Sequence, residues 1–109
     1  MNILIAGDIF ISDEFKGKNL IDKSIISLFE NSDYRIVNLE APITNDNSKD
    51  KIIKTGPHLR NFDTTIIPFL KLLKMDLVTL ANNHILDYGV NGLMNTFKTL
   101  NNEKVSFVG

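Results

Sequence analysis

The chain has 109 residues, of which 43% are hydrophobic and 23% are charged. These values are typical of a single globular domain and argue against a disordered chain. Lys and Arg total 12 and Asp and Glu total 13, so the net charge is −1 and lacks the basic excess of most proteins that bind nucleic acid or anionic membranes. The absence of cysteine excludes disulfides, zinc–thiolate sites, iron–sulfur clusters and a cysteine nucleophile.

The N-terminal segment MNILIAGD lacks the basic region and the long apolar region of a secretory signal peptide. Apolar stretches elsewhere are only a few residues long, far below the roughly 18–20 residues that span a bilayer. The sequence therefore predicts a cytoplasmic protein without a transmembrane segment. Any association of the protein with a membrane is expected to be peripheral and to occur through partners.

Short apolar runs alternate along the chain with amphipathic segments. The run Ile3–Ala6 predicts a strand that is buried on both faces and ends at Gly7. Apolar residues at helical spacing predict a helix over residues 19–31, and the segment YRIVNL predicts a strand over 34–39. The polar residues 40–61 predict a long loop, and loops of that length in compact domains are usually functional or mobile.

The second half of the chain continues this alternation. Asp63 is expected to cap a helix over about 64–74, and the segment DLVTL predicts a strand over 76–80. A helix over 90–101 and a strand over 105–108 complete the pattern. The resulting order βαβαβαβ predicts an α/β fold with a parallel sheet, right-handed crossovers and helices that cover its faces.

Polar residues follow the predicted strands at their carboxyl ends, where open α/β sheets bind ligands. Asp8 follows the first strand, Glu40 follows the second, and Asn83 and His84 follow the third. Two carboxylates, an amide oxygen and an imidazole suit a divalent cation such as Mn, Fe, Zn or Mg. Asp8, Glu40 and Asn83 are therefore candidate metal ligands, in a setting that suits metal-assisted attack of water on a phosphate ester.

Each candidate ligand also has a structural alternative. Asp8 can simply end a strand or a turn, and Glu40 can be a solvated side chain before Pro42. Asn82 and Asn83 can form a turn, because asparagine tolerates left-handed backbone.

His84 and Asp87 are the candidate catalytic residues. His84 is expected at the edge of the sheet rather than on an apolar helix face. Asp87 is expected to be the N-cap of the helix at 90–101, with Gly89 easing the turn, and to orient His84 through a hydrogen bond.

The predicted loop carries a second group of candidates around the dipeptide Gly56-Pro57. Lys54, His58 and Arg60 are candidate substrate-binding residues, since Arg60 can hold an anionic group through two parallel hydrogen bonds. An ordinary solvated loop is the alternative.

Taken together, these residues resemble the bacterial capsule synthesis family. This CapA-like group of poly-γ-glutamate capsule biosynthesis belongs to the calcineurin-like metallophosphoesterase superfamily. The resemblance runs from about residue 3 to residue 109, and its most specific part is the segment Asn-Asn-His-x-x-Asp-x-Gly. The matching residues are Gly7-Asp8, Asn38 to Thr44, Gly56-Pro57-His58, Leu80 to His84, Asp87-Tyr88-Gly89, Gly92-Leu93, Thr96 and Leu100.

The resemblance implies a four-layer α/β/β/α sandwich with a site for two divalent metal ions. Asp8 would match the ligand of the first motif, Glu40 the bridging carboxylate and Asn83 a further ligand. His84 would stabilise the transferring phosphate or protonate the leaving group.

Two departures from the superfamily pattern accompany the resemblance. Phe10 stands where the superfamily commonly has a histidine, two residues after the aspartate. The later histidine motifs that complete both metal sites, and the N-terminal membrane anchor of many family members, are absent from the sequence. Residues 1–109 are therefore expected to be the N-terminal portion of a single metallophosphoesterase-fold domain. On its own, this portion is expected to be marginally stable, prone to associate and catalytically inactive.

The implied function is capsule polysaccharide or poly-γ-glutamate biosynthesis with a metal-dependent phosphoesterase site. Its partners would be an anionic polymer or phosphate-ester substrate and the capsule-synthesis machinery. A non-catalytic component of capsule assembly or polymer handling is the alternative, and a small α/β binding module is a third class. The third strand lacks the acidic phosphoacceptor of a receiver domain, and no dinucleotide or P-loop glycine pattern is present.

Overall fold

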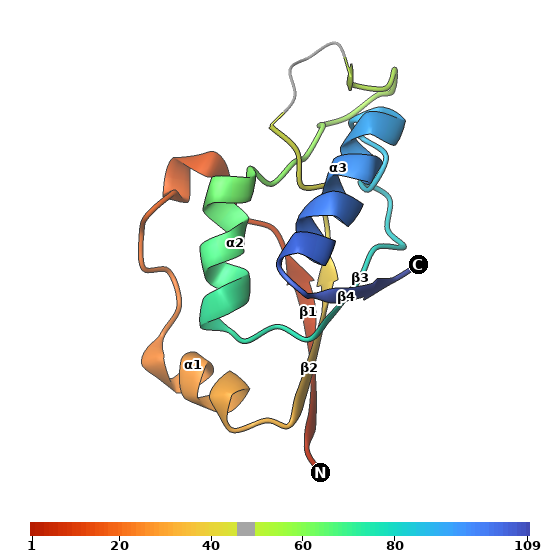
Figure 1. The fold of residues 1–109 in the computed structure, drawn as a ribbon. Helices are drawn as coiled ribbons and strands as arrows, with labels where there is room; N and C mark the ends of the chain where they lie inside the picture. The colour runs from red at the N-terminus through yellow and green to blue at the C-terminus, as the bar shows by residue number, and fades with distance from the viewer. Residues whose placement is uncertain (46–49) are drawn as a thin grey trace.

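The structure, a computed structural model, describes residues 1–45 and 50–109. Strands and helices alternate along the chain, which confirms the predicted α/β order (Figure 1). The elements are β1 (Ile3–Ile9), the 3-10 helix η1 (Asp13–Phe15), α1 (Lys23–Glu30), β2 (Tyr34–Leu39), α2 (Asp63–Leu72), β3 (Leu77–Thr79), α3 (Gly89–Asn102) and β4 (Ser106–Val108).

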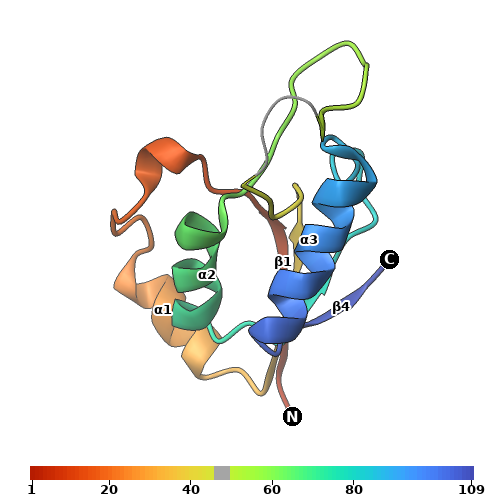
Figure 2. The same cartoon turned by 45° about the horizontal axis from the view of Figure 1, so that its top comes forward.

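The four strands form one parallel sheet in the order β1-β2-β3-β4 within the described residues. Each strand thus lies beside the strand that precedes it in the chain. Right-handed crossovers between such neighbours all place their helices on the same face of the sheet. Figures 1 and 2 show α1, α2 and α3 gathered on one side of it.

The core lies between this helical layer and the sheet. Phe97 of α3 stacks on Phe107 of β4, with ring centres 4.9 Å apart. Burying aliphatic side chains from both layers removes apolar surface from water, which is the main favourable contribution to folding. The most deeply buried members of the core are Leu39, Ile43, Ile66, Leu70, Val78 and Leu100.

The other face of the sheet carries exposed apolar side chains. Ile3, Ile5 and Val108 are 57%, 73% and 52% exposed. The prediction that the first strand is buried on both faces is therefore wrong. Its side chains alternate in burial, because β1 is an edge strand and the helices of the described residues gather on one face of its sheet. The strand also continues past Gly7 to Ile9, after a register shift between Ile5 and Asp8.

The helix boundaries differ from the predicted ones. The first helix occupies Lys23–Glu30 rather than 19–31. The second begins at Asp63 and ends at Leu72, and its N-cap is Phe62, so the prediction that Asp63 caps it is wrong. The reason is that Phe62 has extended backbone, with φ −75° and ψ 143°, which makes Asp63 the first helical residue.

The predicted loop over 40–61 includes residues 46–49, which lie outside the described residues. Ile43 and Asn61 form a parallel β-bridge inside it. The fully buried Asn61 accepts a hydrogen bond from the Ile11 N–H at 2.9 Å and donates one to the Ala41 carbonyl at 3.1 Å. One amide thereby joins the segments that leave β1 and β2, and it fixes the path of the chain above the sheet.

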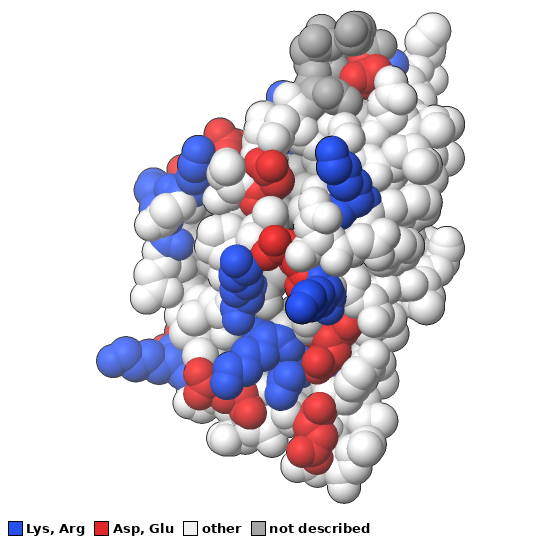
Figure 3. Space-filling view, viewed as in Figure 1, with Lys and Arg blue, Asp and Glu red and all other residues white. Residues whose placement is uncertain are grey.

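Positive and negative side chains intermingle on the helical face rather than gathering by sign (Figure 3). Ion pairs between described residues include Arg35 with Asp76 at 3.0 Å and Lys71 with Glu103 at 3.2 Å. Among the described residues, no helix has the length and apolar character that a membrane span requires.

Candidate functional site

Asp8 and Asn38 begin a network of polar side chains at the carboxyl ends of the strands. The two residues are paired across β1 and β2, and the Asn38 amide donates to Oδ1 of Asp8 at 2.7 Å. The amide oxygen of Asn38 accepts from the Thr79 hydroxyl of β3 at 2.9 Å. Three adjacent strands are thereby linked by side chains where the candidate site lies.

Asn82 carries this network into the turn that follows β3. Its side-chain nitrogen donates to the Leu39 carbonyl at 2.7 Å and lies 3.3 Å from Oδ1 of Asn38. Its side-chain oxygen accepts from the backbone N–H of His84 at 3.0 Å. Asn82 therefore fixes the turn against the end of β2 and holds the backbone of His84 in place.

His84 is hydrogen-bonded to Asp87, as the sequence predicts. Nδ1 of His84 lies 2.6 Å from Oδ2 of Asp87, and the two side chains are 13% and 0% exposed. An ionised carboxylate only accepts, so Nδ1 must carry the hydrogen of this bond. The other ring nitrogen, Nε2, is then the one available to a substrate.

Asp87 accepts two further hydrogen bonds from the loop over 50–62. The Lys54 ammonium donates to its Oδ1 at 2.5 Å, and the Leu59 N–H donates to its Oδ2 at 2.8 Å. Burial by itself raises the pKa of Asp87, but the bonds from Lys54, Leu59 and His84 together lower that pKa below its ordinary value. Asp87 is thus a buried carboxylate that stays ionised.

The prediction that Asp87 is the N-cap of the third helix is wrong. That helix begins at Gly89 with Tyr88 at the cap position and without a side-chain cap bond. Asp87 lies one residue before the cap position, and its side chain accepts from Lys54, Leu59 and His84 instead of from the helix. Gly89 does ease the turn, since its φ is +67°, a value that side chains disfavour.

The predicted metal ligands lie at the same end of the sheet. Asp8 is exposed, Glu40 is half-buried with its N–H bonded to the Ile9 carbonyl at 3.1 Å, and Asn83 is exposed. Neither carboxylate forms an ion pair with a residue in the described ranges. Oδ1 of Asp8 accepts from Asn38, and the carboxylate oxygens of Asp8 and Glu40 are therefore not engaged by a cationic side chain of the described residues.

Carboxylate and amide oxygens are the donors that hard divalent ions prefer. However, residues 1–45 and 50–109 contain no group of three or more His, Cys, Asp or Glu side chains placed to hold a metal. Asp8, Glu40 and Asn83 therefore fit a divalent ion by donor type, as a partial set of ligands.

The predicted substrate-binding residues make contacts within the protein. Lys54 is bound to Asp87, and the His58 ring nitrogen Nε2 lies 2.7 Å from the Ile52 carbonyl. The Arg60 guanidinium lies 4.3 Å from the ring centre of Phe62 and 5.0 Å from that of Tyr88. These contacts hold the loop against the start of α3.

Sequence reasoning missed Asn38 and Leu59 as parts of the site. Asn38 lies between apolar residues of a strand, and a polar residue in that position is a usable signal of a polar network. Leu59 acts through its backbone N–H, for which side-chain identity gives no signal.

Comparison with known proteins adds the family relationship. Residues 2–109 match the family model described as bacterial capsule synthesis protein. The PGA biosynthesis protein CapA of Bacillus subtilis (strain 168) is 32% identical over 99 residues, which cover 88% of this chain and 25% of that protein. The capsule biosynthesis protein CapA of Bacillus anthracis is 28% identical over 116 residues, which cover 100% of this chain and 28% of that protein. The chain thus spans about a quarter of the length of these relatives.

Proposed function

Because the chain belongs to the bacterial capsule synthesis protein family, we propose that it forms part of a metal-dependent phosphoesterase site used in capsule biosynthesis. The observation that carries the proposal is the imidazole of His84, held by the buried carboxylate of Asp87 at the same end of the sheet as two carboxylates, Asp8 and Glu40, that form no ion pair with a described residue. Its substrate would be a phosphate ester or an anionic polymer, and its partners would belong to the capsule-synthesis machinery.

In this proposal His84 acts on the substrate through Nε2. When the ring is protonated, Nε2–H donates a hydrogen bond to a phosphate oxygen or passes its proton to the leaving oxygen. Asp87 supports this role because its hydrogen bond to Nδ1 fixes the orientation and the tautomer of the ring. Lys54 keeps Asp87 ionised and in place.

The metal-binding part of the proposal assigns Asp8, Glu40 and Asn83 as a partial set of ligands. A divalent cation bound there supplies Lewis acidity toward a phosphate oxygen and an acidified water. Asp8 would be oriented by Asn38, whose amide donates to Oδ1, and Oδ2 would be the oxygen that could bind an ion.

The proposal is tested with the full-length gene product loaded with Mn²⁺. Metal content is measured by elemental analysis, and hydrolysis is measured with p-nitrophenyl phosphate and bis(p-nitrophenyl) phosphate. Asp8→Asn and Asn83→Ala should lower the bound metal. His84→Ala should keep the metal and lower kcat by about 10²-fold or more, the usual effect of losing a general acid.

Asp33→Asn is the matched control, since Asp33 is bonded to the Asn2 N–H at the amino end of the strands. It should leave both metal content and kcat unchanged. Unchanged metal in Asp8→Asn and Asn83→Ala would overturn the ligand assignment, and unchanged kcat in His84→Ala would overturn the role of His84.

A second candidate function is a capsule-assembly or polymer-handling component that keeps the fold without turnover. Phe10 favours this candidate. The metallophosphoesterase superfamily that the sequence resembles commonly has a histidine at this position, and a phenyl ring cannot bind a metal in its place. The absence of a three-residue ligand cluster among the described residues favours it as well. Metal-dependent hydrolysis by the full-length gene product that is lost in His84→Ala would reject this candidate.

A further inference from the structure

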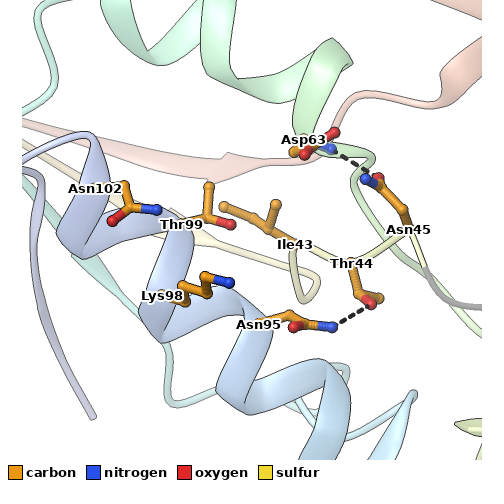
Figure 4. A pocket seen from close by; sticks show the side chains of 8 residues that line it. All are labelled: Ile43, Thr44, Asn45, Asp63, Asn95, Lys98, Thr99 and Asn102. Carbon is orange, nitrogen blue, oxygen red and sulfur yellow. Dashed lines mark hydrogen bonds between the residues drawn. The ribbon is translucent and has the colours of Figure 1, made fainter.

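A polar cavity of about 340 Å³ lies between α2 and α3, away from the site discussed above (Figure 4). We call it the α2–α3 pocket. None of its lining residues is a candidate ligand or catalytic residue. Its volume is at the lower end of the range of roughly 300–1,000 Å³ that small-molecule sites occupy. A ligand of a few heavy atoms is the size that fits.

One wall of the pocket is a polar stripe along α3. Asn95, Lys98, Thr99 and Asn102 follow one another at helical spacing, so their side chains lie on one side of the helix (Figure 4). The buried residues of α3 include Leu100, which packs in the core. An amphipathic helix usually turns apolar side chains toward its neighbours. The polar stripe of α3 faces the space beside α2 instead, and polar side chains in such a space favour a polar ligand.

The other wall comes from the segment after β2 and from the first residue of α2. Thr44 and Asn45 lie on the former, and Asp63 on the latter. The Asn45 oxygen accepts from the Asp63 N–H at 3.2 Å, and the Asn95 amide donates to the Thr44 hydroxyl at 3.2 Å (Figure 4). The first bond joins the segment after β2 to α2, and the second joins that segment to α3. The pocket therefore has a defined shape before any ligand binds.

The pocket presents one charge of each sign from opposite walls. Lys98 comes from α3 and Asp63 from α2 (Figure 4). Neither is ion-paired with a residue in the described ranges, and the two do not pair with each other. Each favours a ligand group of the opposite charge, and two such groups on one small molecule satisfy both.

We propose that the α2–α3 pocket binds a small zwitterion of the amino-acid class. Asp63 receives the ammonium group and Lys98 receives the carboxylate. Asn45 and Asn102 supply amide donors and acceptors to a polar side chain of the ligand. This inference does not depend on the proposed phosphoesterase site, because the two share no residue.

The test is an NMR titration of the ¹⁵N-labelled chain with L-serine and L-glutamine. Two analogues of serine each lack one charge: ethanolamine has no carboxylate, and glycerate has a hydroxyl in place of the ammonium. Either amino acid should cause saturable shifts of the side-chain amides of Asn45 and Asn102 at millimolar concentrations. Both analogues should bind at least about tenfold more weakly, a difference of about 1.4 kcal/mol.

Variants of the two charged residues locate the site. Lys98→Met and Asp63→Asn should each weaken serine and glutamine binding by at least about tenfold, and Lys98→Arg should retain it. Lys71→Met is the matched control, because Lys71 is an exposed lysine of α2 outside the pocket. The amide spectrum of each variant reports its folding in the same experiment.

Three results would overturn the inference. They are the absence of saturable shifts with both amino acids, equal affinity for the analogues that lack one charge, and undiminished binding by folded Lys98→Met and Asp63→Asn. Binding of glycerate but not of the amino acids would assign the pocket to hydroxylated acids instead and would equally reject the zwitterion.

Discussion

Nδ1 of His84 lies 2.6 Å from a carboxylate oxygen of Asp87, a side chain with no exposed surface. A buried carboxylate needs hydrogen bonds and positive charge to stay ionised, and Asp87 obtains these from three places in the chain. The orientation of His84 therefore depends on residues far from it in the sequence, above all on Lys54.

Lys54→Met should destabilise the protein by about 2 kcal/mol. Removing one partner of a fully buried ion pair costs about 3–5 kcal/mol, and the 22% exposure of Lys54 reduces that value. Urea unfolding measures the change. Lys51→Met is the control, since Lys51 forms no ion pair with a described residue and makes a cation–π contact with Tyr88, at 5.9 Å. Equal loss in both variants would contradict a specific role for the Lys54–Asp87 pair.

The stability of the protein should depend on pH through Asp87. Its pKa is lower in the folded state than its ordinary value, so below about pH 4 the unfolded chain binds the proton more readily. The stabilisation that Asp87 provides is fully present above the ordinary pKa of an aspartate. It is lost as the pH falls through the lower pKa that Asp87 has in the folded state. The difference in unfolding free energy between wild type and Asp87→Asn should therefore shrink on acidification. A difference that stays constant from pH 7 to pH 2 would contradict this prediction.

Asn61→Leu should destabilise the protein by about 2–6 kcal/mol. The substitution keeps a similar volume but leaves the Ile11 N–H and the Ala41 carbonyl without their partner, at about 1–3 kcal/mol for each buried group. Thermal and denaturant unfolding measure the effect. Asn31→Leu is the comparison, because Asn31 is exposed at the end of α1 and should change the stability by less than about 0.5 kcal/mol.

Gly92→Ala should destabilise the protein by about 1–3 kcal/mol, although alanine is the better helix former. An added Cβ would lie 2.7 Å from Cβ of Tyr88, so the start of α3 would have to move. Gly7→Ala is the matched control, since nothing lies within 4 Å of its added Cβ. Stabilisation by Gly92→Ala would show that α3 shifts at no cost.

The exposed apolar face of the sheet should promote self-association. Ile5→Lys places a charge where a side chain is 73% exposed on the edge strand and should lower the association measured by sedimentation velocity. Val90→Lys changes a similarly exposed residue, 68%, on the helical side and should leave association unchanged. A wild-type chain that stays monomeric at high concentration would contradict the prediction.

Local sequence patterns predicted the elements and the end of the sheet at which the candidate site lies. The alternation of apolar runs is enough to place β2 and α3, because their side-chain periods differ. The residues Asp8 and His84 were found because each lies at or just beyond the end of a strand.

The remaining features depend on contacts between distant parts of the chain. Lys54 and Asp87 are 33 positions apart, and Ile11 and Asn61 are 50 apart, so no local spacing indicates that they meet. The one-sided cover of β1 was missed for a similar reason. An apolar run shows that a strand is hydrophobic, whereas its burial depends on which helices pack over it.

The agreement between strand order and chain order has a consequence for biosynthesis. Each strand after β1 pairs with the strand that was synthesised just before it. No strand therefore requires a pairing partner that has not yet left the ribosome. Domains begin to fold from the N-terminus during synthesis. In this chain the order of translation is also the order in which the sheet can be assembled, one βα unit at a time.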